Sequence, residues 1–448
     1  MKTQSKWIPL VGLLAVLAGS PVRAELREFT DVKGRTISAE FLGFQDAENV
    51  NLRMATGKMV TVALARLSKA DQDYIAEHPA AKLTPLKLPK VPLFVVKDWN
   101  EQLGRQETYF INSKGQRAFR RPLSEIYGNG FIDVLGEYAI VKGAYYGVLD
   151  TAGSAQFGVS RVGPDKLEPG ATDAPIFLGR YGTGDAAYVQ YLRKDGKPFI
   201  AARFADARPF NSERAWVNLE AGDKPKPGHK GIWTLVDYRG NLLHAFDSLE
   251  VQDFSEGRAG VALDVNSTQW SIIDTDAKVI AKGPFRRVGR FINGAAVVDG
   301  RLMDRDGNWL LEEKGECSID SRYENSQSDA VVARRARRVA GATRYGILRR
   351  STGEFIADIP DDYYLDRGFF NGLAMIRDAK LQKYGYISRT GELAIKPEFS
   401  GAEAFQGGFA NVKVGETRDP AVINLAGEVI WKAKVPKVAE PPAEEKIE

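Results

Sequence analysis

Along most of the chain, hydrophobic and polar residues alternate in short runs that are separated by tight turns. Alternation with a period of two over about four to eight residues predicts half-buried β-strands, and Gly-containing turns between such runs predict antiparallel hairpins. The segment from Lys383 to Ile395 is representative, because two apolar runs flank the turn that ends at Gly391. The same order of strand, turn and strand recurs to the end of the chain, so the sequence predicts an all-β protein.

The turns of these hairpins recur at a regular interval. Successive turns lie 30 to 46 residues apart when Ala277 is accepted in place of one glycine, and a period near 40 residues is typical of repeat architectures. The turn positions are Gly115, Gly153, Gly196, Gly240, Ala277, Gly307, Gly353, Gly391 and Gly427. One such unit cannot bury its apolar face alone, so neighbouring units must stack. We expect about eight antiparallel β units that close like a propeller, which hides sheet edges; an open, curved β array is the alternative.

Two further signals accompany each turn. An aromatic residue followed by Gly opens the hairpin at Tyr146-Gly147, Tyr345-Gly346 and Tyr384-Gly385, whereas Trp233 and Trp270 keep only the aromatic residue. A Phe, a Gly-containing turn and an apolar strand follow, as in Phe291-Ile292-Asn293-Gly294-Ala295. Residues 107 to 431 thereby resemble the WG-repeat family. The resemblance implies a β-repeat architecture and little chemistry.

Residues 25 to 78 form a separate first unit. Ile37, Ala39 and Phe41 alternate on one strand, and Ser68 with Asp71 three residues later is typical of a helix N-terminus. The run from Arg27 to Ile75 resembles the Sla-type homology domain. This resemblance implies a small Src-homology-3-like barrel, and binding of short peptides in eukaryotic relatives makes a peptide or polymer ligand an expectation. The matching positions include Phe29, Asp31, Gly34, Ile37, Phe41, Val50, Leu52, Gly57, Val62, Leu67, Ser68, Asp71 and Tyr74.

The ends of the chain and the join between its parts are different in composition. Residues 1 to 24 combine Lys2 and Lys6 with an apolar stretch and a small-residue cleavage site at Ala24, which predicts a signal peptide and a periplasmic or secreted protein. Residues 79 to 106 are expected to form a Pro- and Lys-rich linker, and residues 432 to 448 a disordered tail. The expected domains are therefore the signal (1–24), the Sla-type domain (25–78), the linker (79–106), the repeats (107–431) and the tail (432–448).

The formal charge of +4 drops to +1 once the signal is removed, because Lys2, Lys6 and Arg23 lie within it. Bulk charge therefore does not favour nucleic-acid binding. No later segment is long and apolar enough for stable membrane insertion. Cys317 is the single cysteine, so an intramolecular disulfide is excluded. The oligomeric state is left open by the sequence.

Two sets of residues are candidates for a binding surface. Arg334, Arg335, Arg337 and Arg338 form a local positive run in a nearly neutral chain, which could contact an anionic polymer, a lipid headgroup or an acidic partner, or form a solvated loop. The aromatic residues that open the hairpins, Trp233, Trp270, Tyr345 and Tyr384, could stack on carbohydrate, or they could form the core between units.

Motifs for metal, nucleotide or nucleophilic chemistry are missing from the sequence. We therefore expect no cofactor, no metal site and no enzymatic activity. The sequence favours an exported, non-catalytic binding or scaffold protein of the cell envelope, which contacts a protein or polymer partner through the repeat surface and the small barrel. The alternative is a hydrolase that acts on polysaccharide, with carboxylates in a central cavity of the repeats.

Overall fold

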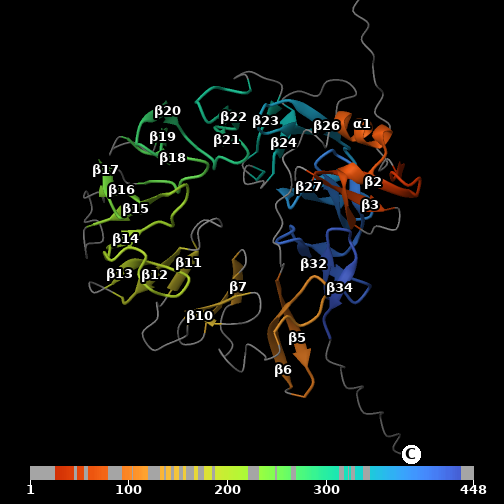
Figure 1. Ribbon diagram of the computed structural model, residues 1–448, viewed down its shortest axis with the longest axis horizontal. Helices are drawn as coiled ribbons and strands as arrows, with labels where there is room; N and C mark the ends of the chain where they lie inside the picture. Colours follow the sequence, from red (N-terminus) through yellow and green to blue (C-terminus); the bar gives the residue numbers. More distant parts are fainter. Residues whose placement is uncertain are drawn as a thin grey trace, which may run out of the picture.

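A computed structural model describes the parts of the chain that lie between residues 26 and 434 (Figure 1). The described residues are 26–44, 48–54, 59–78, 93–102, 104–119, 132–135, 138–142, 146–150, 155–157, 166–169, 176–183, 187–219, 232–247, 250–263, 269–311, 317–320, 322–323, 328–335 and 344–434. Residues 1–24, where the signal peptide is predicted, lie outside them. The described part contains a small N-terminal domain and a ring of sheets that follow one another in chain order.

The N-terminal domain is one four-stranded antiparallel sheet and a helix. Its elements are β1 (Arg27–Thr30), β2 (Thr36–Phe44), β3 (Asn49–Met54), β4 (Met59–Ala63), the 3-10 turn η1 (Leu64–Arg66) and α1 (Lys69–Glu77). Alternation places Ala39 and Phe41 on the buried face, as predicted, and Ile75 of α1 packs on them. The Ser68 side chain accepts a hydrogen bond from the Asp71 amide at 3.2 Å, which confirms the predicted helix start.

The predicted barrel is only partly formed in the described residues. The strand order is β1-β2-β3-β4, and β1 and β4 are not paired with each other. A single bridge from Asp31 to Leu67 joins the end of β1 to the segment after η1. Strand β2 bends at a bulge between Phe41 and Gly43, and a bulge of this kind gives a short sheet the curvature of a small barrel.

The repeat region contributes nine antiparallel sheets among the described residues, one more than the approximately eight units predicted. The first five are β5 (Phe94–Asn100) with β6 (Arg105–Ile111); β7 (Ile132–Leu135), β8 (Tyr138–Lys142), β9 (Tyr146–Asp150) and β10 (Ala155–Phe157); β11 (Lys166–Pro169), β12 (Phe177–Tyr181) and β13 (Tyr188–Leu192); β14 (Asp206–Ala207), β15 (Arg214–Asn218), β16 (Ile232–Asp237) and β17 (Leu242–Asp247); and β18 (Arg258–Val261), β19 (Trp270–Asp274) and β20 (Val279–Phe285).

The remaining four sheets complete the ring. They are β21 (Ala295–Val298) with β22 (Arg301–Asp304); β23 (Cys317–Ser318), β24 (Ala330–Arg335), β25 (Tyr345–Arg349) and β26 (Phe355–Ile359); β27 (Tyr363–Phe370), β28 (Leu373–Asp378), β29 (Tyr384–Ser388) and β30 (Leu393–Phe399); and β31 (Gly401–Ala402), β32 (Phe409–Val414), β33 (Asp419–Asn424) and β34 (Val429–Lys432).

Each sheet packs on the next through its own apolar cluster, and the last sheet packs on the first. Between β31–β34 and β5–β6, the buried residues Val96, Tyr109, Ile111, Phe409 and Val422 form one core. A comparable cluster lies between the two sheets of each remaining consecutive pair. The repeats therefore form a closed ring, which is the propeller-like arrangement predicted from the sequence. The alternative, an open and curved array, is not formed.

Two hydrogen bonds reinforce the closure between the ends of the ring. The indole Nε1 of Trp431 donates to the hydroxyl of Tyr109 at 3.0 Å. The backbone amide of Lys434 donates to the Asp98 carboxylate at 2.8 Å. Because residues 93–106 and 432–434 take part in this closure, the boundaries predicted for the linker and the tail were wrong. The polar residues Lys97 and Asp98 interrupt the apolar pattern of β5, so the sequence of this first strand of the ring resembles that of the linker before it.

The periodic turns have the same geometry in most units. Asp237 illustrates it: its Oδ1 accepts the amides of Arg239 and Asn241 at 2.9 Å, and its carbonyl accepts the Gly240 amide at 3.0 Å. The glycine has a positive φ of 84°, which L-residues with a side chain rarely adopt. Ala277 has a φ of 66°, so it takes the glycine position in its turn at a cost in backbone strain.

The turn glycines also dock each unit on the outer segment of the preceding one. A Cβ atom at the glycine would meet that segment in each of these pairs: Gly240 with Ile200, Gly307 with Ile280, Gly353 with Leu310, Gly391 with Ala357, Gly427 with Ile395, and Gly115 with Ile430. The last pair is the ring closure, which repeats the contact made between consecutive units. The period in the sequence therefore reflects both a backbone conformation and a close approach between sheets.

A second series of hairpin turns is connected by side chains. Residues in these turns have two consecutive positive φ values, as at Glu256 and Gly257, which is the backbone of tight two-residue hairpins. The Glu256 carboxylate accepts the amides of Asn293 and Gly294 in the next unit at 2.6 and 2.7 Å. Equivalent bonds run from Gly257 to Ser212 and from Gly408 to Asn371. These bonds fix the angle between successive sheets.

Candidate functional site: the rim of the ring and the domain junction

The aromatic residues predicted as a surface lie in or against the core instead. Trp233 is only 8% exposed and belongs to the cluster between β14–β17 and β18–β20, which corrects the prediction of a surface position. Trp270, Tyr345 and Tyr384 are half-buried and pack against the clusters of their own sheets. Each of these three residues begins a central strand and packs against an apolar cluster. Their side chains therefore belong to the core and not to a ligand-binding surface.

The predicted arginine patch is described at two of its four positions. Arg334 is exposed at the end of β24. Arg335 is half-buried, forms an ion pair with Asp358 at 2.8 Å and lies over the ring of Phe355 at 5.0 Å from its centroid. Arg337 and Arg338 lie outside the described residues. The structure therefore places one arginine in solvent and holds a second one against an aromatic side chain.

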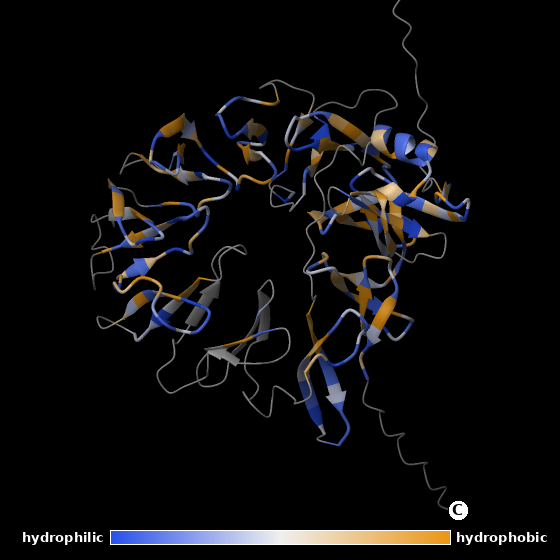
Figure 2. Cartoon of the chain, in the orientation of Figure 1, coloured by the Kyte–Doolittle hydropathy of each residue, from blue (hydrophilic) through white to orange (hydrophobic). Residues whose placement is uncertain are grey.

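A row of exposed apolar side chains lies on the outer segments of the units, in an outer strand or, for Trp309, in an isolated bridge after β22. These residues all stand two positions after the turn residue of their unit, and they are between 39% and 51% exposed: Leu242, Val279, Trp309, Phe355 and Val429. Figure 2 shows hydrophobic residues on the outermost strands β17 and β20. Sequence reasoning missed the row because it attributed apolar strand residues to the core.

Arginine side chains cover the two aromatic members of this row. The guanidinium of Arg301 lies 3.9 Å from the centroid of the Trp309 ring, and it also donates to the Leu311 carbonyl at 2.7 and 3.0 Å. Arg335 and Phe355 form the equivalent pair in the next sheet. A cation held over an aromatic face is attracted by the ring electrons while it keeps N–H groups available to an anion.

The charge of the chain is unevenly distributed, with a positive surplus on these sheets. Residues 279 to 359 contain fifteen Lys and Arg against eleven Asp and Glu, so this segment of 81 residues carries a net charge of +4, equal to the formal charge of the whole chain. The exposed arginines among its described residues are Arg286, Arg287, Arg290, Arg305, Arg322, Arg334 and Arg344. We call the part of the ring from β20 to β26 the basic sector. A positive surface with exposed aromatic side chains is suited to an anionic ligand.

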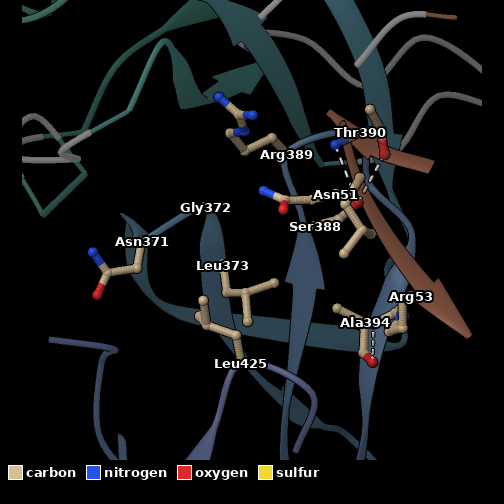
Figure 3. Close-up of a pocket in the computed structure, with 11 residues that line it drawn as sticks. Asn51, Arg53, Asn371, Gly372, Leu373, Ser388, Arg389, Thr390, Ala394 and Leu425 are labelled. Atoms are coloured by element: carbon tan, nitrogen blue, oxygen red, sulfur yellow. Dashed lines mark hydrogen bonds between the residues drawn. The ribbon is translucent and has the colours of Figure 1, made fainter. Parts of the chain in front are cut away.

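A second candidate site is the pocket at the junction of the N-terminal domain and the β27–β30 sheet (Figure 3). Asn51 and Arg53 of β3 line one side, and the tip of the β29–β30 hairpin lines the other. The lining residues are Leu42, Asn51, Arg53, Asn371, Gly372, Leu373, Ser388, Arg389, Thr390, Ala394 and Leu425. Burial lowers the pKa of Arg389 to about 10, partly opposed by the charge of Asp329.

Next to this pocket, two carboxyl groups face each other across the domain interface. Glu40 of β2 is 2% exposed, and Glu392 of the hairpin is 7% exposed. Burial, together with the hydrogen bond and the negative charge of Glu40, raises the pKa of Glu392 to about 9. Arg53 pairs with Glu40 and donates to the backbone carbonyls of Leu393 and Ala394. Nothing in the local sequence distinguished Glu392, because its partner is 352 positions away.

The described residues hold no group of three or more His, Cys, Asp or Glu side chains arranged for a metal ion. Within the same residues, no helix has the length and apolar character needed to cross a membrane.

Comparison with known protein families confirms both predicted resemblances. The WG containing repeat matches residues 191–221 and 384–417, and the SLA1 homology domain 1 matches residues 18–83. The chain therefore contains an SLA1 homology domain 1 followed by WG repeats. The first WG match runs from the end of β13 past β15, and the second runs from β29 to the turn after β32, so each match spans the join between two consecutive sheets of the ring.

No curated protein matches the chain. Among solved structures, apo AztD from Citrobacter koseri is similar with a TM-score of 0.35 and 10% identity over 77% of this chain and 95% of its own. The Dos1 propeller gives 0.31 and 10% over 92% and 97%, and the computationally designed Ika8 protein gives 0.32 and 11% over 59% and 85%.

Proposed function

We propose that this protein is a non-catalytic binding scaffold of the cell envelope, and that its basic sector contacts an anionic polymer. The observation that carries the proposal is the pair of exposed aromatic side chains, Trp309 and Phe355, each with an arginine held over its face. Such a pair offers an apolar surface to a sugar ring or acyl chain and a guanidinium to a neighbouring carboxylate or phosphate.

The ring makes this surface rigid. Trp309 and Phe355 stand at equivalent positions of adjacent sheets, and the hairpin turn at Gly353 is seated on Leu310, the residue after Trp309. A ligand that contacts both sheets therefore meets two binding elements at a fixed separation. A polymer with repeating units can contact equivalent positions on successive sheets. Each additional contact is then made within the same complex and increases the overall affinity.

Export to the envelope is part of the proposal. It is supported by the signal-like residues 1–24, in which Lys2 and Lys6 precede an apolar stretch and a small-residue cleavage site. The N-terminal domain would add a second contact with a peptide or polymer, as its family resemblance implies.

The alternative, a polysaccharide hydrolase, needs two carboxyl groups that face a cavity open to substrate. The pair of Glu40 and Glu392 is the nearest approach to such a site among the described residues. Both side chains are buried between domains, and Arg53 engages Glu40 and the adjacent backbone. This arrangement favours a structural role for the pair over catalysis.

The test is binding of the chain from Glu25 onward to a panel of acidic and neutral polysaccharides, teichoic-acid-type polymers and anionic vesicles. We expect affinity for an acidic polymer that falls with added salt, and a loss of about tenfold in Trp309→Ala, since such contacts contribute roughly 1–2 kcal/mol. Val279→Ala removes an exposed apolar side chain of the same row without an arginine partner, so it should bind like the unmodified protein.

Three results would contradict the proposal. Equal losses in Trp309→Ala and Val279→Ala would mean that the row acts through apolar area alone. Binding that is independent of salt would exclude an electrostatic contact. Release of new reducing ends or shorter products from the bound polymer would favour the hydrolase.

A further inference from the structure

The N-terminal domain contacts the ring at the β29–β30 hairpin. Arg53 of β3 crosses the interface and donates to the carbonyl oxygens of Leu393, at 3.4 Å, and of Ala394. Arg53 and its partner Glu40 are 7% and 2% exposed at the side chain. A buried ion pair is costly to desolvate, and the bonds from Arg53 to the Leu393 and Ala394 carbonyls, which offset part of that cost, exist only while the domain lies on the ring.

The tip of the β29–β30 hairpin differs from the equivalent tips in the burial of its glutamate. A glutamate follows the turn glycine in three successive units, at Glu354, Glu392 and Glu428. Glu354 is 55% exposed and pairs with Arg349, and Glu428 is exposed and accepts a hydrogen bond from the Asn424 side chain at 2.7 Å. Glu392 alone is buried, and Glu40 faces it from the N-terminal domain.

The charges around this contact do not balance without a proton. Glu40 and Glu392 would bring two negative charges into the interface, and Arg53 supplies one positive charge that already pairs with Glu40 Oε2. The oxygens Glu40 Oε1 and Glu392 Oε2 have no other hydrogen-bond partner. The other groups at the tip are the Ser388 and Thr390 hydroxyls, which bond each other at 2.8 Å, and Arg389, which is buried and under the influence of Asp329.

We propose that the N-terminal domain is held on the ring by a proton-dependent latch, in which Glu40 and Glu392 share one proton across the interface and its loss to solvent weakens docking. When the proton leaves, two carboxylates face each other in a site from which water is excluded, and the repulsion favours separation of the domains. The latch is independent of the basic sector, so it goes beyond the proposed function.

The direction of the pH dependence follows from the raised pKa of Glu392. The docked state keeps a proton up to about pH 9, whereas the exposed carboxyl of the undocked state loses it near its usual pKa of 4.5. Docking is therefore strongest below the lower value and weakens as pH rises through this window. One proton taken up on docking corresponds to a fall of about tenfold in the docking constant per pH unit.

The experiment uses the full chain with fluorescent donor and acceptor labels at Lys33→Cys and Glu416→Cys in a Cys317→Ser background. Lys33 and Glu416 are exposed, on the N-terminal domain and on the last sheet. Energy transfer is followed against urea at pH values from 6 to 9, and the midpoint for its loss reports docking. We expect the midpoint to fall as pH rises with a slope near one proton.

Glu392→Gln keeps the shape and supplies an N–H donor to Glu40 without titrating. We expect its midpoint to lose that slope and to exceed the unmodified midpoint at pH 9. Glu428→Gln makes the same change one unit further on and should keep the slope. The proposal is overturned if the unmodified protein shows no slope, or if the two variants have the same slope. Should Glu392→Gln fail to fold, Glu40→Gln tests the other half of the pair with the same expected loss of slope.

Discussion

Closure of the ring can be tested with one substitution, Gly115→Ala, which adds a Cβ atom at the contact between the first and last sheets. Gly115 has a φ of 72°, and its α-carbon lies so close to β34 that a Cβ would fall on the carbonyl oxygen of Ile430. Gly104, in the turn between β5 and β6, has a φ of 59° and no atom within 4 Å of the same position. The two glycines thus share the backbone conformation and differ only in the contact with the last sheet.

The expected costs follow from these environments. At either position, alanine in the left-handed region costs about 1 kcal/mol. At Gly115, the hairpin must also move away from β34, which strains or opens the core of Val96, Tyr109, Ile111, Phe409 and Val422. Overpacking adds about 1–3 kcal/mol. We therefore expect a loss of about 2–4 kcal/mol for Gly115→Ala and about 1 kcal/mol for Gly104→Ala.

The assay is chemical denaturation combined with hydrogen exchange by mass spectrometry. In Gly115→Ala, peptides from residues 94–111 and 409–432 should exchange faster, although they are about 300 positions apart, while peptides from β14–β20 stay protected. In Gly104→Ala, faster exchange should be confined to the β5–β6 hairpin. Equal destabilisation by the two variants, or faster exchange in β5–β6 without any change in β33–β34, would refute closure of the ring by this contact.

Three further predictions concern single contacts. Ala277→Gly should stabilise the protein by about 0.5–1 kcal/mol in a denaturant titration, because alanine there has a φ of 66°; a loss of stability would mean that the contact of the Ala277 methyl with the neighbouring core outweighs the strain. Glu256→Ala should cost about 1–2 kcal/mol and raise exchange at Asn293 and Gly294, whose amides it accepts, whereas Glu213→Ala, an exposed glutamate at the corresponding turn, should be nearly neutral. Asp71→Asn should cost about 2 kcal/mol, since Asp71 accepts bonds from Arg27, Ser68 and the Thr30 amide. Although burial alone would raise the pKa of Asp71, these bonds lower it, so its contribution is present above pH 3.8 and is lost as pH falls through the lowered value; unchanged acid sensitivity of the N-terminal domain in Asp71→Asn would contradict this.

The sequence predicted a large part of the local structure because local structure depends on neighbouring residues. A turn that needs a positive φ selects Gly, and an Asp or Asn three positions earlier bonds the turn amides, so both leave a visible period. Ser68 and Asp71 likewise marked the start of α1. Two predictions failed for equally local reasons. The polar residues of β5 prevented its prediction as a strand, and exposed apolar residues at the outer edge of the units were assigned to the core.

The long-range contacts required the tertiary structure. Closure brings Tyr109 to Trp431, and it depends on the summed angles between nine sheets, which no single unit encodes. In the same way, Glu354, Glu392 and Glu428 occupy equivalent sequence positions, yet only Glu392 meets Glu40. The sequence by itself determined the units, their turns and the two families to which they are similar. The tertiary structure decided that the units form a ring, which apolar residues remain on its rim and where the N-terminal domain is seated, because these depend on packing between segments that are hundreds of residues apart.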